Sequence, residues 1–473
     1  MGALAGLFKE LGHDVSGSDV RFDPPMGPAL EAWGIRLVKG FDPAHLCLEP
    51  DLVVVGNVCR SNNPEALAAI EGGFRYTDMA HGLAEHVLDG TVPVVVAGTH
   101  GKTTTSAMCA WLLLDAGLDP GMLIGGLPKN FDKSFRVPGR SRMGMGSDIR
   151  RAVPFVVEGD EYDTAFFEKT PKFWHYRPEV AVLTSIEHDH IDIYPTNSEY
   201  VAAFARFVEL VPETGLIIAC ASSKQVVDVV RKNSGSEVLW YSLEGQDCYG
   251  CPLQYVGSLL EADGAGQAFE LTLDGVSLGR FLVPQHGTHN VSNAIAAIAV
   301  AVHRFGVPVE QVRESLARFA GVRRRQDLLG VVGGVRVYDD FAHHPTAVAE
   351  TLRALRVRHP EGSLFAVFEP RSATACRAIH QDEYAGAFGS ATHVILAPVG
   401  RDGIPDSERL DVGRIVEEIR RRGLWARSPG TVDGIVTELV ARVRPGDTIA
   451  LLSNGAFGGI SGLLLEALVV LDS

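Results

Sequence analysis

The sequence has no excess of basic residues and no long apolar run. Its 473 residues include 43 Lys and Arg against 58 Asp and Glu, which gives a formal net charge of −15. The densest basic runs are only 323–325 and 420–422, whereas a nucleic-acid-binding surface needs a broad basic stripe. The apolar stretches 291–302 and 462–471 are shorter than the roughly 18 residues that cross a bilayer. We therefore expect neither a nucleic-acid partner nor a membrane partner.

Cysteine is also sparse. Seven cysteines, an odd number scattered along the chain, are typical of reduced thiols rather than of a disulfide framework. The first ten residues have neither the basic start nor the long apolar segment of a secretory signal, which indicates a cytoplasmic protein. Cys248 and Cys251 have the spacing of a redox or zinc pair. No second pair and no nearby histidine accompanies them, so chance spacing in a loop is the simpler interpretation.

What the sequence does contain is a regular alternation of apolar, strand-like runs with helical patterns. This alternation is typical of α/β units with parallel sheets. At about 100–200 residues per domain, the length predicts two to four domains, and breaks near residues 88 and 323 divide the chain into 1–88, 89–322 and 323–473. The last segment is expected to begin with one strand over 331–339. A loop rich in Gly, Arg, Ser and Met is expected over 133–148.

A phosphate-binding loop is the strongest local signal. Residues 98–104 read GTHGKTT and lie between an apolar strand pattern at 94–97 and a helical pattern. In that context backbone N–H groups converge on phosphate oxygens, the helix N-terminus favours negative charge, Lys102 reaches the outer phosphates and the Thr103 hydroxyl can bind Mg²⁺. The loop is shorter than the common G-x-x-x-x-G-K-[ST] form, which has glycine where Val96 stands.

Charged side chains follow two further predicted strands. Glu158 ends one of them and opens the acidic run 158–163, and His190 lies in the charged run 186–192 after the next strand. Because ligands bind at the carboxyl ends of parallel strands, Glu158 and His190 are expected to meet above the loop. Oxygen ligands there suit Mg²⁺. An acidic cluster can also be a solvated face and a single histidine can be structural, but two such clusters at two strand ends favour a metal or phosphate site.

Five motifs together resemble the Mur ligase family, the ATP-dependent amide-forming enzymes of peptidoglycan synthesis. In chain order they are GTHGKTT, VEGDEYD, IEHDHID, the H-N-x-x-N run 289–293 and YDDFAHHP at 338–345. The resemblance implies an α/β protein of three domains: a truncated Rossmann-like N-terminal domain for a UDP-sugar, a central P-loop ATPase domain and a C-terminal Rossmann-like domain. The runs 161–176, 368–372 and 453–460 resemble the branch that attaches a murein tripeptide to UDP-N-acetylmuramate.

The resemblance also implies roles for individual residues, with ATP and Mg²⁺ as cofactors and UDP-N-acetylmuramate and the tripeptide as substrates. The implied ATP-binding residues are Gly98, Thr99, His100, Gly101, Lys102, Thr103, Thr104, His289, Asn290, Asn293, Arg325 and Asp340. The implied metal ligands are Thr103 and Glu158 at one Mg²⁺ and His190 near a second, and the implied catalytic residues are Lys102, His190, His343 and His344. Taken singly, Asn290 could cap a helix, Asp340 could be a turn residue and Arg325 could belong to a solvated linker; the order of the motifs favours the functional interpretation.

The sequence departs from the family pattern in two ways. It has no lysine between Lys172 and Lys224, so we do not expect the carbamate-modified lysine of several relatives. It also begins inside what should be the first helix, without the preceding strand and glycine-rich turn, which leaves Ser18 and Asp19 as candidate UDP-sugar contacts. A ligase that adds L-alanine to UDP-N-acetylmuramate and a catalytically weak nucleotide-binding protein stay open as alternatives.

Overall fold

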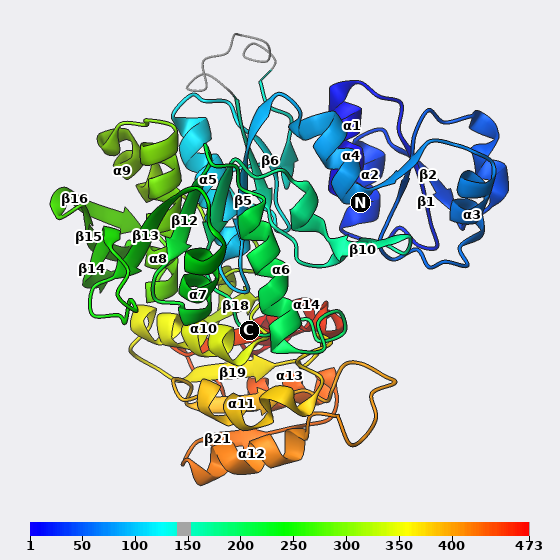
Figure 1. Cartoon of the computed structure of the whole chain (residues 1–473). Helices are drawn as coiled ribbons and strands as arrows, with labels where there is room; N and C mark the ends of the chain where they lie inside the picture. Colours follow the sequence, from blue (N-terminus) through cyan, green and yellow to red (C-terminus); the bar gives the residue numbers. More distant parts are fainter. Residues whose placement is uncertain (140–152, 473) are drawn as a thin grey trace.

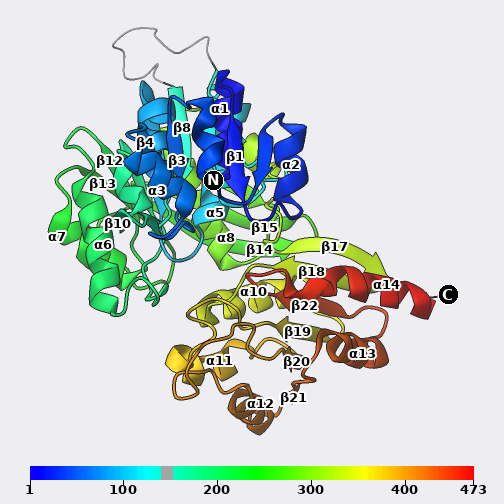
Figure 2. The same ribbon diagram turned by 90° about the vertical axis from the view of Figure 1, so that its right-hand side faces the viewer.

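The computed structural model describes residues 1–139 and 153–472 and has three α/β units in chain order. The first unit comprises α1 to η2, the central unit β5 to α9, and the C-terminal unit β17 to α14. Figures 1 and 2 show that the first unit packs against one side of the central unit and that the C-terminal unit lies below it. The expectation of a three-domain α/β fold is confirmed.

The first unit contains two separate pairs of parallel strands, β1 with β2 and β3 with β4. Its helices α1 and α4 bury Leu4, Leu7 and Leu83 in the same apolar core as Val95 of the central sheet, so the two units share a packed interface. The elements are α1 (Gly2–Leu11), β1 (Ser16–Asp19), α2 (Met26–Ala32), β2 (Arg36–Lys39), η1 (Pro43–Leu48), β3 (Val53–Val55), α3 (Pro64–Glu71), β4 (Tyr76–Asp78), α4 (Met79–Leu83) and η2 (Ala84–Leu88).

The central unit is built on a sheet with the strand order β16-β15-β14-β13-β12-β11-β5-β8-β6-β7. All residues of β5 are buried, because α5 and α8 cover one face of the sheet and α6 and α7 cover the other. Its elements are β5 (Thr91–Ala97), α5 (Lys102–Asp115), β6 (Gly121–Leu123), β7 (Phe135–Arg136), β8 (Val153–Glu158), β9 (Asp163–Ala165), β10 (Glu168–Pro171), η5 (Lys172–His175), β11 (Val180–Leu183), α6 (Asn197–Glu209), β12 (Leu216–Cys220), α7 (Lys224–Asn233), β13 (Glu237–Leu243), β14 (Leu253–Asp263), β15 (Gly266–Leu273), β16 (Val276–Val283), α8 (Thr288–Ala299), η6 (Val300–Arg304) and α9 (Val309–Ala317).

Two features of this sheet differ from the sequence-based expectation. Strands β14, β15 and β16 pair antiparallel and extend the parallel sheet at one edge, whereas only parallel sheets were expected. Two-residue turns favour such hairpins, and Asp274-Gly275, with φ of 49° and 78°, forms one between β15 and β16. The loop expected over 133–148 contains β7 at its start, and residues 140–148 of it lie outside the described residues.

The C-terminal unit has the strand order β17-β18-β22-β19-β20-β21, with helices on both faces. The single strand expected over 331–339 is wrong: Gly333 and Gly334, with φ of 55° and 75°, turn the chain between antiparallel β17 and β18. The elements are β17 (Asp327–Val332), β18 (Val335–Asp340), α10 (Pro345–Arg358), β19 (Leu364–Phe368), η7 (Ala378–His380), α11 (Gln381–Ala387), β20 (His393–Leu396), α12 (Val412–Arg421), β21 (Trp425–Arg427), α13 (Val432–Arg442), β22 (Thr448–Leu452), η8 (Phe457–Gly459) and α14 (Ile460–Asp472).

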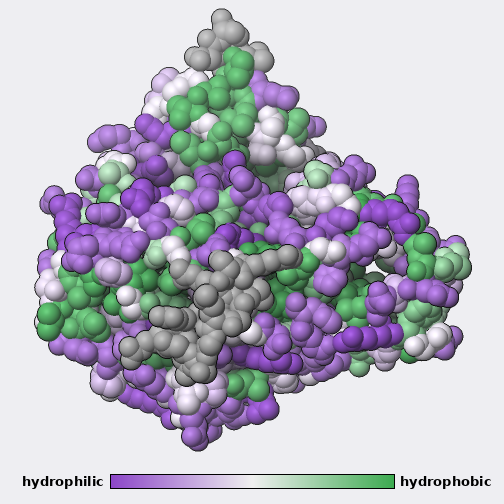
Figure 3. Space-filling model, turned by 90° about the horizontal axis from the view of Figure 1, so that it is seen from above, coloured by the Kyte–Doolittle hydropathy of each residue, from purple (hydrophilic) through white to green (hydrophobic). Residues whose placement is uncertain are grey.

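The surface has the mixed character of ordinary globular proteins. The face in Figure 3 is mainly hydrophilic, with hydrophobic side chains in separate groups. Within residues 1–139 and 153–472, no helix has the length and apolar character needed to span a bilayer.

Candidate active site

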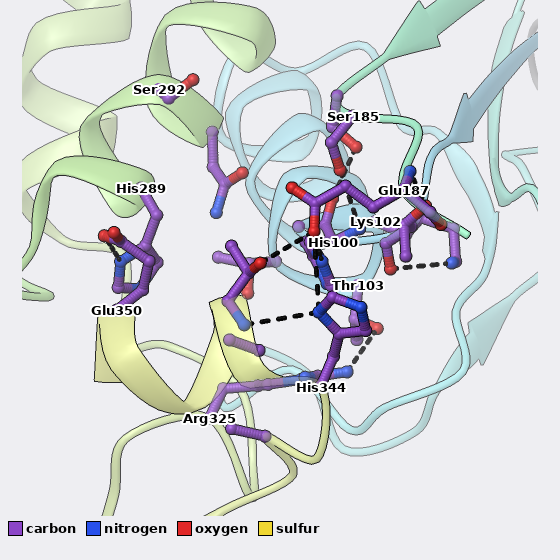
Figure 4. Close-up of a pocket in the computed structure, with 18 of the residues that line it drawn as sticks. His100, Lys102, Thr103, Ser185, Glu187, His289, Ser292, Arg325, His344 and Glu350 are labelled. Carbon is purple, nitrogen blue, oxygen red and sulfur yellow. Dashed lines mark hydrogen bonds and ion pairs between the residues drawn. The ribbon is translucent and has the colours of Figure 1, made fainter. Parts of the chain in front are cut away.

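A cavity of about 710 Å³ lies where the central and C-terminal units meet. Its walls come from the segments that follow β5, β8, β11 and β18 and from the first turns of α8 and α10. In Figure 4, His100, Lys102 and Thr103 of the central unit face two further residues. Arg325 lies in the segment that leads into the C-terminal unit, and His344 belongs to that unit. The cavity therefore opens at the carboxyl ends of parallel strands, where α/β folds place ligands.

Two glycines allow the loop between β5 and α5 to pack closely against its neighbours. Gly98 has a φ of 141°, and a Cβ there would overlap the Thr184 hydroxyl and the backbone of Ser185 at the end of β11. Gly101 has a φ of 83° and is the N-cap of α5, and a Cβ there would overlap the Asn293 side-chain oxygen on α8. Both positions need glycine because of this close approach and the positive φ.

Lys102 lies in a buried charge network below the cavity. Its ammonium group donates to Glu161 Oε1 at 2.9 Å, and the same carboxylate oxygen lies 2.9 Å from His190 Nε2. Burial raises the pKa of Glu161, but Lys102 and His190 outweigh this effect and lower it to about 2. Burial likewise lowers the pKa of His190, but Asp189 and Glu161 leave it raised overall. Glu161 Oε2 is buried and has no hydrogen-bond partner among the described residues, so this carboxylate has capacity for a ligand.

Thr103 and Glu158 bring oxygen atoms together at the N-terminus of α5. The Thr103 hydroxyl donates to Glu158 Oε1 at 2.8 Å, and the backbone N–H of Gly125 donates to Glu158 Oε2 at 2.6 Å. Arg325 Nη2 lies 3.3 Å from the Thr103 hydroxyl. A hydroxyl and a carboxylate at this distance fit a Mg²⁺ site. His190 Nε2 instead contacts Glu161, so His190 lies apart from this oxygen pair, and its assignment near a second Mg²⁺ stays a prediction.

Glu187 connects the central unit to the C-terminal unit across the cavity. Its Oε2 accepts a hydrogen bond from the Thr346 hydroxyl at 2.8 Å and lies 3.0 Å from His100 Nε2 and 3.5 Å from His344 Nδ1. Burial raises the pKa of Glu187, but His100, Thr346 and His344 lower it to about 2. His344 also begins α10, where its Nδ1 accepts from the Thr346 N–H.

Replacing His344 is expected to change the pH dependence of stability. Burial, with His100 and His380 nearby, lowers the pKa of His344 to about 3, whereas an unfolded histidine has a pKa near 6.5. Between these values the unfolded state binds a proton that the folded state does not, so stability is present above pH 6.5 and is lost as pH falls. His344→Asn keeps a helix-capping side chain. Between pH 7.5 and pH 5, the free energy of unfolding of this variant is expected to fall by about 2 kcal/mol less than that of the unchanged protein. Urea denaturation at both pH values checks this, and equal pH dependence in both proteins would contradict it.

The start of α8 forms another wall of the cavity. His289 Nδ1 lies 3.5 Å from Glu350 Oε2 of α10, on the far side of the cavity from His100 in Figure 4. Asn290 donates to the His286 carbonyl at 2.8 Å, and Asn293 lies beside Gly101. The capping alternative for Asn290 is wrong, because α8 starts at Thr288, before Asn290, and its N-cap is Gly287. All three predicted residues line the cavity.

Asp340 and His343 enter the cavity from the segment after β18. The Asp340 carboxylate is buried and accepts backbone N–H groups from Gln326 at 2.7 Å and from Ala342 at 2.8 Å, so its contacts are those of a turn residue. His343 Nε2 lies 3.7 Å from Asp189 Oδ2 of the central unit. Both residues line the cavity, and the His343 contact joins the C-terminal unit to the central unit.

Some predicted residues lie elsewhere. Ser18 and Asp19 end β1 in the first unit and do not border the cavity; the Ser18 hydroxyl donates to Glu65 Oε1 at 2.8 Å. In the 323–325 run, only Arg325 lines the cavity. Arg324 instead donates to the carbonyls of Ser453 and Gly455 at 2.7 Å.

The sequence-based prediction missed Glu161 and Glu187. Both lie in motifs that were recognised, the acidic run after β8 and the charged run after β11. Each run contains several acidic residues at adjacent positions, and spacing alone does not show which carboxylate turns toward Lys102 or toward the C-terminal unit. A buried cation such as Lys102 does require a carboxylate partner, and that requirement was the available signal.

Comparison with protein families accounts for nearly the whole chain. The "Mur ligase family, catalytic domain" matches residues 1–90, the "Mur ligase middle domain" matches 96–301, and the "Mur ligase, glutamate ligase domain" matches 324–455. The chain belongs to the Mur ligase family. This confirms the family predicted from the five motifs.

Mur ligases of two kinds are similar over the full length. The chain is 37% identical to the UDP-N-acetylmuramate–L-alanyl-γ-D-glutamyl-meso-2,6-diaminoheptandioate ligase of Escherichia coli (strain K12), over 99% of this chain and 96% of that protein. It is 32% identical to the UDP-N-acetylmuramate–L-alanine ligase of Roseiflexus sp. (strain RS-1), over 99% and 97%. Among solved structures, a murein peptide ligase from Psychrobacter arcticus 273-4 is similar with a TM-score of 0.71 and 35% identity, over 99% of this chain and 96% of that chain.

Proposed function

We propose that this Mur ligase joins the tripeptide L-alanyl-γ-D-glutamyl-meso-diaminopimelate to UDP-N-acetylmuramate at the expense of ATP. The observation that carries the proposal is the full-length similarity to a ligase of that name, at 37% identity, on a chain that has a phosphate loop and a cavity between two units. A cytoplasmic location, a Mg²⁺ requirement and UDP-sugar binding near Ser18 and Asp19 belong to the same proposal.

The proposed reaction has two steps. A carboxylate oxygen of the muramate attacks the γ-phosphorus of ATP, ADP leaves, and an acyl phosphate forms. The peptide's amino group then attacks the acyl carbon, the C–N bond forms, inorganic phosphate leaves with the original carboxylate oxygen, and the amine gives up its proton. Phosphoryl transfer depends mainly on positioning and on neutralising charge, so no side-chain nucleophile is needed.

The chain's own residues supply this neutralisation locally, in spite of the overall charge of −15. Lys102 and the N–H groups at the start of α5 would hold the transferred phosphoryl group, and Arg325 lies beside Thr103. Thr103 and Glu158 would hold Mg²⁺. When bound, this ion neutralises phosphate charge.

Residues of the C-terminal unit would shield the acyl phosphate from water. His343, His344 and Thr346 contact Asp189 and Glu187 of the central unit across the cavity. A site closed in this way protects a reactive intermediate from hydrolysis.

The amine substrate distinguishes the tripeptide-adding relatives from the L-alanine-adding relatives. With UDP-N-acetylmuramate and ATP, the tripeptide is expected to support ADP release at least tenfold faster than L-alanine, as kcat/KM in a coupled assay. Faster turnover with L-alanine would assign the chain to the alanine-adding function, which the 32% identity to such a ligase keeps as the second candidate. Tight nucleotide-sugar binding without any ADP release would favour the catalytically weak protein instead.

A further inference from the structure

A cluster of two histidines and a glutamate lies at the junction of the first and central units. His81 is on α4 of the first unit, Glu168 begins β10, and His175 ends η5. In Figure 1 the hairpin that contains β10 projects from the central unit toward the first unit. Ring contact between Tyr76 and Phe167, at 5.2 Å between centroids, packs the tip of this hairpin against β4. None of the three cluster residues lines the cavity of the candidate active site.

The donor atoms of the cluster already converge. Glu168 Oε2 lies 3.9 Å from His81 Nε2, Glu168 Oε1 lies 3.9 Å from His175 Nε2, and the imidazole rings are 4.0 Å apart. One donor atom from each residue lies within 4.8 Å of the other two. Donors at about 2.0–2.2 Å from a tetrahedral zinc ion are roughly 3.3 Å apart. Small side-chain rotations therefore bring them to bonding distance.

A buried carboxylate orients one of the histidines. His81 Nδ1 lies 2.6 Å from Asp78 Oδ2, and Asp78 is only 1% exposed. With a proton on Nδ1 donated to Asp78, the lone pair of His81 lies on Nε2, which faces Glu168. Metal-binding histidines are typically oriented in this way, by a carboxylate on the nitrogen that does not bind the metal.

The charge of the cluster favours a cation. Asp78 and Glu168 supply two carboxylates, and neither forms an ion pair with a lysine or arginine of the described residues. The other neighbour of His175 Nε2 is the neutral hydroxyl of Thr170 at 2.7 Å, which a metal ion can displace. The two carboxylates thus have only imidazoles as charge partners.

We propose that His81, Glu168 and His175 bind a divalent transition-metal ion of the zinc class, which joins the first unit to the central unit. Two imidazoles and one carboxylate are donors that suit zinc. Mg²⁺ prefers an all-oxygen set, so this site is chemically distinct from the proposed Mg²⁺ site at Thr103 and Glu158. Three protein donors leave a fourth position for water.

Zinc titration of the metal-free full-length protein tests the proposal. In excess Mg²⁺, His175→Asn is expected to lose one equivalent of bound Zn²⁺ relative to the unchanged protein. Asp78→Asn keeps an N-cap for α4 but removes the orienting carboxylate, and is expected to weaken that equivalent about 10–100-fold. His303→Asn is the matched control, because His303 has one carboxylate neighbour, Glu237 at 3.4 Å, and is not part of a three-donor cluster; its Zn²⁺ binding stays unchanged.

Cobalt provides a second readout that does not depend on stoichiometry. Co²⁺ is expected to give visible absorption bands of a low-coordinate site in the unchanged protein and in His303→Asn, but not in His175→Asn. If His175→Asn does not fold, Glu168→Gln, at a side chain that is 39% exposed, serves the same test. Equal Zn²⁺ binding by all variants would overturn the proposal. Displacement of the bound zinc by ATP would also overturn the proposal, because that result would place the zinc at His100, Glu187 and His344 in the active-site cavity.

Discussion

Lys102→Met is expected to lower the rate of ADP formation by about 10³-fold. The ammonium group lies at the cavity, where α5 begins, and removal of one preorganised charge-stabilising donor typically costs 10²–10³-fold in rate. A residue that also positions the γ-phosphate should lie at the upper end of this range. Steady-state ADP release with saturating UDP-N-acetylmuramate and tripeptide measures the effect.

The control for this variant concerns stability. Lys102→Met leaves the buried carboxylate of Glu161, 1% exposed, without its ammonium partner, and such a change commonly destabilises a protein by about 3–5 kcal/mol. The double variant Lys102→Met with Glu161→Gln also removes the carboxylate charge that has lost its ammonium partner. It is expected to recover the thermal stability but not the activity. A stable double variant with near-normal turnover would show that Lys102 does not act on the phosphoryl group.

Glu158→Gln is expected to lower ADP release by about 10²-fold and to raise the Mg²⁺ concentration needed for half-maximal rate. The amide oxygen can still accept from the Gly125 N–H, and the amide NH2 group can donate to the Thr103 hydroxyl oxygen, so the loop geometry is retained while the charge is lost. Initial rates over a range of Mg²⁺ concentrations measure both effects.

Asp163→Asn is the matched control for Glu158→Gln. Asp163 belongs to the same acidic run, but it lies 3.8 Å from Lys169 and does not line the cavity. Its Mg²⁺ dependence should equal that of the unchanged protein. If Glu158→Gln behaves in the same way as Asp163→Asn, the metal assignment is wrong.

The fold could be predicted where the apolar pattern was unambiguous. The strand expected at 393–396 is β20, and the predicted phosphate loop follows β5 as expected, with residues 98–101 between β5 and α5 and 102–104 in the first turn of α5. The hairpin of β17 and β18 was missed, because the valines at 331, 332, 335 and 337 continue the strand pattern on both sides of Gly333-Gly334. The signal was available, since two glycines between strand-like runs are typical of a two-residue hairpin turn.

The candidate site was predictable at the level of motifs but not at the level of contacts. Motif order placed Lys102, Glu158 and His190 at one edge of one sheet, and the structure brings them there. The partner of Lys102, however, is Glu161 rather than Glu158, and the contact between Glu187 and Thr346 joins residues 159 positions apart. The first pair depends on packing within the central unit and the second on how two units pack, and no local pattern encodes either.

Transfer of ¹⁸O tests the central claim most directly. UDP-N-acetylmuramate with both oxygens of the lactyl carboxylate labelled is incubated with ATP and the tripeptide, and the phosphate and the nucleotide-sugar product are analysed by mass spectrometry. The account predicts one ¹⁸O in each phosphate released, together with a product that has gained the tripeptide with loss of one labelled oxygen. Amide product accompanied by unlabelled phosphate would contradict the acyl phosphate, and labelled phosphate without tripeptide product would contradict the proposed amine.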